Sequence, residues 1–137
     1  MKIKNIKKII AEYFYLHPTA KLRVRGIERT LKLPLPSVIR YCKELQKESL
    51  LARISIGAVI FYTASRSETY LLEKKLYNLK ALYQSGLIEY LKQELSNPTL
   101  VLFGSYAKGE DTEDSDIDIY IETHSKKQLN LERFKKQ

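Results

Sequence analysis

Two aspartates one residue apart, preceded by a Gly-Ser pair, are the residues of this sequence best suited to chemistry. Gly104 and Ser105 follow a short apolar run, and Asp116 and Asp118 come shortly after them. Glycine adopts φ > 0 without steric cost and lets a phosphate approach the backbone closely. A helical turn that begins at Ser105 would point unpaired N–H groups at an anion, and Lys108 would add positive charge. We therefore predict phosphate binding at Gly104, Ser105 and Lys108.

Alternating acidic and apolar residues predict a strand from Asp116 to Glu122. On such a strand Asp116, Asp118 and Tyr120 share one face, and the isoleucines take the other. Two carboxylates about 7 Å apart along a strand repel each other, and a divalent cation relieves that repulsion. Mg²⁺ accepts one or two carboxylates together with phosphate oxygens, so Asp116 and Asp118 are the predicted metal-binding residues, with Mn²⁺ as the other candidate ion. The alternative is an edge strand with a solvated acidic face, where Gly104 only makes a turn.

These motifs resemble those of the nucleotidyltransferase superfamily that includes DNA polymerase beta, and specifically its minimal nucleotidyltransferase branch. The resemblance covers about residues 86–121 and rests on Gly104-Ser105, Ala107-Lys108-Gly109 and Ser115-Asp116-Ile117-Asp118. It implies that Gly104 and Ser105 bind the β- and γ-phosphates, while Asp116 and Asp118 hold two metal ions for in-line attack on the α-phosphorus. The products would be a nucleotidylated acceptor and pyrophosphate.

The sequence departs from that family in one respect. Active members carry a third carboxylate on the next strand, whereas here the residues after Glu122 place Leu129, Leu131 and Phe134 at the spacing of an amphipathic helix. Three explanations stay open: the sequence lacks the later strands, a partner supplies the carboxylate, or the site binds nucleotide without turning it over.

Positive charge is concentrated in the first half of the chain. The chain has 24 Lys and Arg against 16 Asp and Glu, a net charge of +8, and residues 1–65 alone carry +9 while residues 99–137 carry −2. This distribution indicates a polyanion-binding module followed by an acidic metal site. The single cysteine, Cys42, excludes an internal disulfide and a Cys/His zinc cluster, and we expect it to be a buried structural thiol. The absence of a long apolar run or a signal peptide predicts a cytoplasmic protein.

Residues 1–65 have the pattern helix, helix, turn, helix and hairpin. Apolar residues at helical spacing run from Ile3 to Phe14, a second helix is expected over 25–31, a third opens at Pro36, and a hairpin with a tight turn at Gly57 covers Ile54 to Tyr62. This order resembles the winged helix-turn-helix family across residues 2–64. Ser49 stands where that family often has glycine.

The winged-helix resemblance implies that the third helix enters the major groove of double-stranded DNA. The expected contacts are Ser37, Arg40, Tyr41 and Lys43 from that helix and Arg53 from the hairpin. The alternative is that the charges are only solvated and the module docks another protein.

Residues 67–95 are strongly helical, with a break expected at Ser85-Gly86. One stripe of this segment is apolar and consists of Leu72, Leu76, Leu79, Tyr83 and Leu87. The neighbouring tyrosines are expected in packing or dimer contacts, and a homodimer built on this helix would suit a palindromic DNA site.

The sequence thus predicts an α+β chain in three parts. Residues 1–65 form a winged helix-turn-helix, 66–85 a helical connector, and 86–137 a small nucleotidyltransferase-like domain without its later strands. The expected function is Mg²⁺-dependent transfer of a nucleoside monophosphate from a nucleoside triphosphate, by a DNA-binding protein without membrane association. The alternative is a non-catalytic DNA-binding regulator whose second domain senses nucleotide or mediates assembly.

Overall fold

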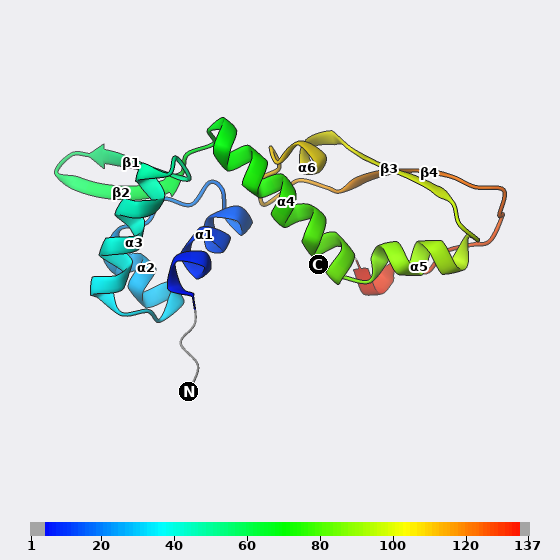
Figure 1. Ribbon diagram of the computed structural model, residues 1–137, viewed down its shortest axis with the longest axis horizontal. Helices are drawn as coiled ribbons and strands as arrows, with labels where there is room; N and C mark the ends of the chain where they lie inside the picture. The colour runs from blue at the N-terminus through cyan, green and yellow to red at the C-terminus, as the bar shows by residue number, and fades with distance from the viewer. Residues whose placement is uncertain (1–4, 135–137) are drawn as a thin grey trace.

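The computed structural model describes residues 5–134, which form an α+β fold of helices and two small antiparallel sheets, as expected (Figure 1). The N-terminal part has the element order of a winged helix-turn-helix: α1 (Ile6–Leu16), α2 (Val24–Leu31), α3 (Leu35–Lys47), β1 (Leu51–Ile56) and β2 (Val59–Ala64). The third helix begins one residue earlier than predicted, so Pro36 occupies its second position. Ile3 lies outside the described residues.

The core of the N-terminal part forms where α1, α2 and α3 meet. Val38 and Cys42 are fully buried and Leu45 nearly so, as their spacing predicts for one face of α3. Phe14 of α1 and Ile27 of α2 are also fully buried in this core. Burial raises the pKa of the Cys42 thiol to about 12, so Cys42 is a packing residue and not a nucleophile.

The end of α3 keeps the usual geometry although serine replaces the expected glycine. Ser49 takes the left-handed conformation, with φ of 66°. The N–H of Leu50 donates to the carbonyl of Leu45 at 2.9 Å, and the N–H of Ser49 donates to Gln46 at 3.0 Å, a Schellman-type pair of bonds. The hydroxyl of Ser65 donates to the Ser49 carbonyl at 2.6 Å, which ties this end to the chain after the hairpin.

The hairpin is longer than predicted and gains a short third segment. Ile56 pairs with Val59 across a two-residue turn, in which Gly57 has φ of 63°. Leu22, from the loop before α2, bridges to Tyr62 of β2 through backbone hydrogen bonds of 2.9 and 2.7 Å. The sequence analysis did not find this bridge, because a single bridging residue carries no periodic pattern.

Helix α4 (Glu68–Gln84) joins the two parts of the molecule (Figure 1). Its buried residues are Tyr70, Lys74, Asn78 and Leu82, and the leucine stripe noted in the sequence faces outward. The hydroxyl of Tyr70 donates to the carbonyl of Phe14 at 2.7 Å, so α4 belongs to the core of the N-terminal part. Within residues 5–134, no helix is both long and apolar enough to cross a membrane.

The C-terminal part contains α5 (Leu87–Glu94), β3 (Thr99–Phe103), α6 (Gly104–Lys108) and β4 (Asp118–Glu122). Helices α4 and α5 are separated at the predicted break, where Gly86 has φ of 87°. Strands β3 and β4 are antiparallel, and Phe103 pairs with Asp118. The predicted strand start at Asp116 is therefore wrong by two residues. Because β3 ends at Phe103 and turns into α6, residues before Asp118 have no strand to pair with.

The predicted helix over residues 129–134 is also wrong. This segment is irregular apart from one 3₁₀ turn, Glu132–Phe134. It lies along α5 instead: Lys127 forms a 2.8 Å ion pair with Glu94, and the N–H of Asn130 donates to the Tyr90 hydroxyl at 2.9 Å. The rings of Phe134 and Tyr90 lie 5.4 Å apart. These contacts hold the segment against α5 in a conformation that is not α-helical.

Candidate functional site

Gly104 and Asp118 are brought into direct contact at the junction of β3 and α6. Gly104 has φ of 80°, the left-handed region that the sequence analysis expected. A Cβ atom at this position would lie 3.3 Å from Cγ of Asp118 and would overlap its Oδ2. The Asp118 carboxylate therefore sits over the bare Cα of Gly104, in space that only glycine leaves open.

The alternation predicted for the strand holds from Asp118 to Glu122. Asp118, Tyr120 and Glu122 are exposed, while Ile119 and Ile121 are half-buried. Asp116 is exposed in the loop that leads into β4, two residues from Asp118. Both predicted metal-binding carboxylates thus stand at the end of the sheet nearest α6.

The predicted phosphate-binding residues lie on the short helix α6. Ser105 is half-buried in its first turn and Lys108, its last residue, is exposed. Gly109 ends the helix with φ of 73°, and a Cβ there would collide with the backbone of Leu71 in α4. The second glycine of the motif thus lets α6 pack directly on α4.

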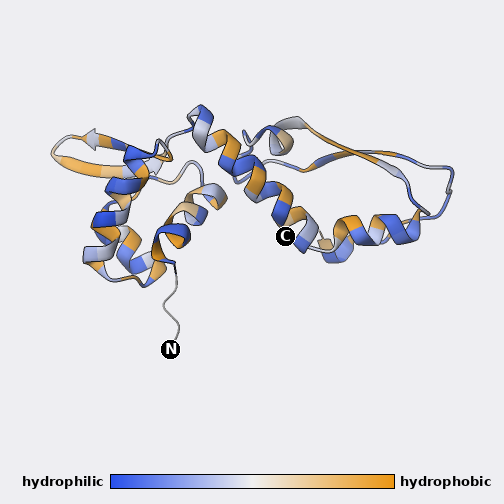
Figure 2. Cartoon of the chain, viewed as in Figure 1, coloured by the Kyte–Doolittle hydropathy of each residue, from blue (hydrophilic) through white to orange (hydrophobic). Residues whose placement is uncertain are grey.

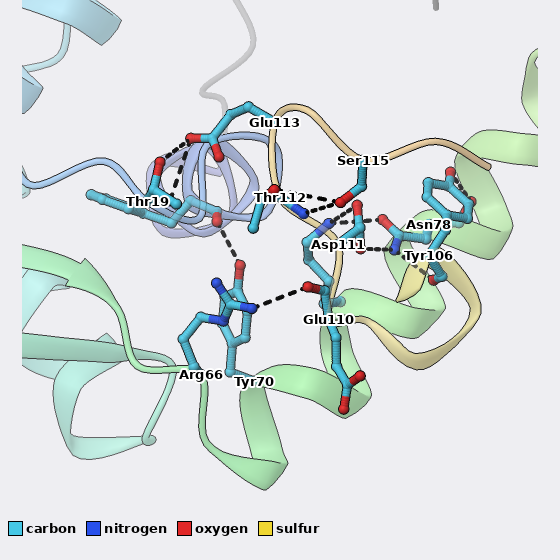
Figure 3. Close-up of polar contacts among 12 residues, drawn as sticks. Thr19, Arg66, Tyr70, Asn78, Tyr106, Glu110, Asp111, Thr112, Glu113 and Ser115 are labelled. Carbon is cyan, nitrogen blue, oxygen red and sulfur yellow. Dashed lines mark hydrogen bonds and ion pairs between the residues drawn. The ribbon is translucent and has the colours of Figure 1, made fainter. Parts of the chain in front are cut away.

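A buried polar network fixes the loop after α6 to helix α4 (Figure 3). Lys74 Nζ donates to Asp111 Oδ2 at 2.9 Å and to Asn78 Oδ1 at 3.1 Å. Asn78 Nδ2 donates to Asp111 Oδ1 at 2.9 Å and to the carbonyl of Tyr106 at 3.0 Å. The Tyr106 hydroxyl donates back to the carbonyl of Asn78 at 2.8 Å. Both carboxylate oxygens of Asp111 therefore accept hydrogen bonds. Tyr106, within α6, and Asp111, after it, attach α6 to α4.

The sequence analysis missed Lys74, Asn78 and Asp111. Lys74 and Asn78 are 2% and 3% exposed, so their polar groups need the partners that Asp111 supplies. Asp111 comes 37 residues after Lys74 along the chain, and no local pattern links them. The available signal was the four-residue spacing of Tyr70, Lys74 and Asn78 on one face of α4.

The same loop reaches the N-terminal part (Figure 3). Arg66 Nη2 donates to the carbonyl of Glu110 at 3.1 Å, and the Thr19 hydroxyl donates to Glu113 Oε2 at 2.7 Å. Desolvation raises the pKa of Glu113. The hydrogen bonds from Thr19 and the charge of the nearby His17 lower it by more, so the net shift of the pKa is downward. Ser115 closes a tight turn by accepting from the N–H of Thr112 at 2.9 Å, and this turn precedes Asp116.

Two of the predicted DNA contacts, Lys43 and Arg53, share a groove that the other three do not line. Arg40, Lys43 and Arg53 are exposed, and Lys43 and Arg53 line one groove of about 610 Å³ between α3 and the hairpin. Tyr41 is half-buried against the core, and the Arg40 guanidinium lies 4.5 Å from the centre of its ring. Ser37 is half-buried and lies about a sixth of a turn from Arg40 around the helix. Lys43 and Arg53 therefore line the same groove, whereas the Arg40 guanidinium lies over the Tyr41 ring.

Comparison with known families bears on the C-terminal part. Residues 85–137 match the nucleotidyltransferase domain family. The match includes Gly104, Ser105, Asp116 and Asp118, and it leaves residues 1–84 unassigned. A nucleotidyltransferase domain is thus present, in agreement with the motifs in the sequence.

Solved structures add one similarity, to a point mutant of ZitR from Lactococcus lactis. The two chains are 16% identical and superpose with a TM-score of 0.47. The superposition covers 68% of this chain and 62% of ZitR, so the chain matches less than two thirds of that protein. No curated protein matches the chain.

The residues at the Gly104–Asp118 junction fit a divalent cation bound together with a triphosphate. Asp116 and Asp118 supply exposed carboxylate oxygens, the ligands that Mg²⁺ prefers, and the bare Cα of Gly104 leaves the space that the Asp118 carboxylate occupies. Within residues 5–134 no group of three His, Cys, Asp or Glu side chains is placed to hold a metal. A cation at this junction would accordingly take its remaining ligands from phosphate oxygens and water.

Proposed function

We propose that this protein binds DNA through its winged helix and binds a nucleoside triphosphate with Mg²⁺ through its nucleotidyltransferase domain, transferring the nucleoside monophosphate to an acceptor hydroxyl. The observation that supports the nucleotide site most strongly is the contact between Gly104 and the Asp118 carboxylate. It places a carboxylate that could bind a cation at the start of α6, against a glycine whose missing side chain leaves that carboxylate room.

Different residues of the chain would bind the cation and the triphosphate at this site. Asp116 and Asp118 would hold Mg²⁺, which neutralises charge on the triphosphate when it is bound. The Ser105 hydroxyl and the backbone N–H groups that open α6 would hold phosphate oxygens, and Lys108 would add positive charge. The buried bonds of Asn78 and Asp111 keep α6 in place while the ligand binds.

A second candidate function is nucleotide sensing without catalysis. Two observations favour it: the described residues offer two carboxylates and no third ligand, and the loop between α6 and β4 is tied to the N-terminal part through Arg66 and Thr19. Binding at Asp118 would then alter a loop whose other contacts lie on the DNA-binding part. Mn²⁺ would substitute for Mg²⁺ under either function, because both ions accept carboxylate and phosphate oxygens.

DNA binding is supported by the charge and form of the α3 face. Residues 1–65 carry a net charge of +9, and Arg40, Lys43 and Arg53 are exposed on α3 and the hairpin. A helix bearing these side chains in the major groove, with the hairpin on the phosphate backbone, is the ordinary use of this element order.

Calorimetric titration of the full chain with ATP, GTP, CTP and UTP in Mg²⁺ tests the proposal, with pyrophosphate measured in the same samples. Binding with pyrophosphate release supports transfer. Binding without release, also in the presence of double-stranded DNA, supports sensing. If none of the four nucleotides binds, the nucleotide site is wrong, and electrophoretic DNA-binding assays then test the winged helix separately.

A further inference from the structure

Four large apolar side chains point to solvent from α4. Leu72, Leu76, Leu79 and Tyr83 are 53%, 56%, 45% and 57% exposed, and we call them the α4 seam. Figure 2 shows hydrophobic and hydrophilic positions mixed along the whole of α4. The opposite side of the helix, with Lys74 and Asn78, packs on the helix's own chain. The rest of the chain leaves the seam about half exposed, although Leu79 and Tyr83 also border a hollow toward the C-terminal sheet. Such a contiguous apolar stripe normally marks an interface.

The spacing of the α4 seam indicates which kind of surface covers it. Its members follow one another at intervals of four, three and four residues. Alternating steps of four and three residues are the spacing with which one helix packs lengthwise on another. In the part of the chain that the structure describes, no helix covers the seam, as its exposed fractions show. A helix with the same repeat in a second copy of the chain would supply a matching surface.

Charged residues beside the seam determine the orientation of that pairing. Glu73 and Lys80 flank it on one side, and Glu68 and Lys75 flank it on the other. In an antiparallel pair Glu73 faces Lys80 of the second copy, and the twofold symmetry repeats this opposite-charge contact. In a parallel pair Lys75 would face Lys80 and Glu68 would face Glu73, which are repulsive contacts. Among residues 5–134 none of these four side chains forms an ion pair within its own chain.

We propose that the protein forms an antiparallel homodimer in which the α4 seams of two copies pack together. Leu76 of one copy lies opposite Leu79 of the other, and Leu72 lies opposite Tyr83. The inference goes beyond the proposed function, because the pairing needs neither nucleotide nor DNA. It also relates the two winged helices by a twofold axis, the symmetry of a palindromic DNA site.

Charge reversal tests both the dimer and its orientation. Sedimentation equilibrium of the full chain from about 1 to about 200 µM should show reversible dimers, a range suited to a short helix pair. Glu73→Lys and Lys80→Glu should each weaken association by about 5-fold or more, and the double variant should restore it to within about 2-fold. Stronger association of the single variants would indicate the parallel pair and overturn the proposal. A monomer throughout that range would also overturn it.

An apolar control separates the seam from general surface effects. Leu76→Asp should abolish the dimer, whereas Leu16→Asp should leave it unchanged, since Leu16 is also 56% exposed but lies on α1. Circular dichroism checks that both variants fold. If the two substitutions weaken the dimer equally, the α4 seam is not the interface.

Discussion

Gly104 and Asp118 meet at the end of the C-terminal sheet, with the aspartate carboxylate resting over the glycine Cα. Cγ of Asp118 would be only 3.3 Å from a Cβ added to Gly104, and Phe103, the residue before the glycine, pairs with Asp118 across the two strands. The strand pairing thus positions the carboxylate, and the missing side chain leaves it room. Much of the proposed nucleotide chemistry depends on this one contact.

Replacing Gly104 by alanine should remove triphosphate binding. The added Cβ would displace the Asp118 carboxylate and would also sit at φ of 80°. Gly86→Ala is the matched control, because Gly86 has φ of 87° but nothing within 4 Å of an added Cβ. Each variant should lose about 1 kcal/mol of unfolding free energy from backbone strain. Only Gly104→Ala should weaken ATP binding, by about 10-fold or more; equal binding losses would refute the role of the contact.

Breaking the buried Lys74–Asp111 ion pair should be strongly destabilising. Lys74→Met leaves the Asp111 carboxylate buried without its cation, which should reduce the unfolding free energy by about 3–5 kcal/mol. Adding Asp111→Leu should recover part of that loss, because no uncompensated charge remains. Urea unfolding of the single and double variants measures both values. A double variant less stable than Lys74→Met alone would contradict this account of the network.

The α3 face should show the salt dependence of phosphate contacts. Arg40→Ala and Lys43→Ala should weaken binding to duplex DNA, and each lost phosphate contact should reduce the slope of log K against log salt by about 0.9. Lys126→Ala is the control, since Lys126 is exposed in the C-terminal loop. Fluorescence anisotropy at several salt concentrations measures the slopes. Unchanged slopes for both α3 variants would reject this face as the DNA-binding surface.

Stability should fall at alkaline pH because of Cys42. Burial raises the pKa of its thiol from 9.0 to about 12, so the unfolded chain releases this proton at lower pH than the folded chain does. The contribution of Cys42 to the free energy of unfolding is therefore complete below about pH 9, and it declines as pH rises toward 12. Tyr15 and Tyr106, whose pKa values burial raises to about 12, act in the same direction. Urea midpoints at neutral and alkaline pH should show a smaller decline for Cys42→Ala; an equal decline would mean that this thiol is not involved.

Local patterns predicted the elements well where one face of the element is buried. Val38, Cys42 and Leu45 follow the helical repeat and are buried, and residues Asp118 to Glu122 alternate as predicted. The start of β4 could not be predicted from its own residues, because it depends on where β3 ends. The network of Lys74, Asn78 and Asp111 joins residues far apart in the chain. Hydrophobicity alone predicts that the leucine stripe of α4 is the buried face, whereas the face that is buried is partly polar.

Titration of the chain with ATP in Mg²⁺, comparing wild type with Asp118→Asn and Glu122→Gln, tests the central claim most directly. Asp118 and Glu122 are exposed at opposite ends of β4, but only Asp118 contacts Gly104. We predict Mg²⁺-dependent binding by the wild type, unchanged binding by Glu122→Gln, and binding at least about 10-fold weaker for Asp118→Asn. No binding by the wild type, or equal binding by all three proteins, would contradict a nucleotide site at the Gly104–Asp118 junction.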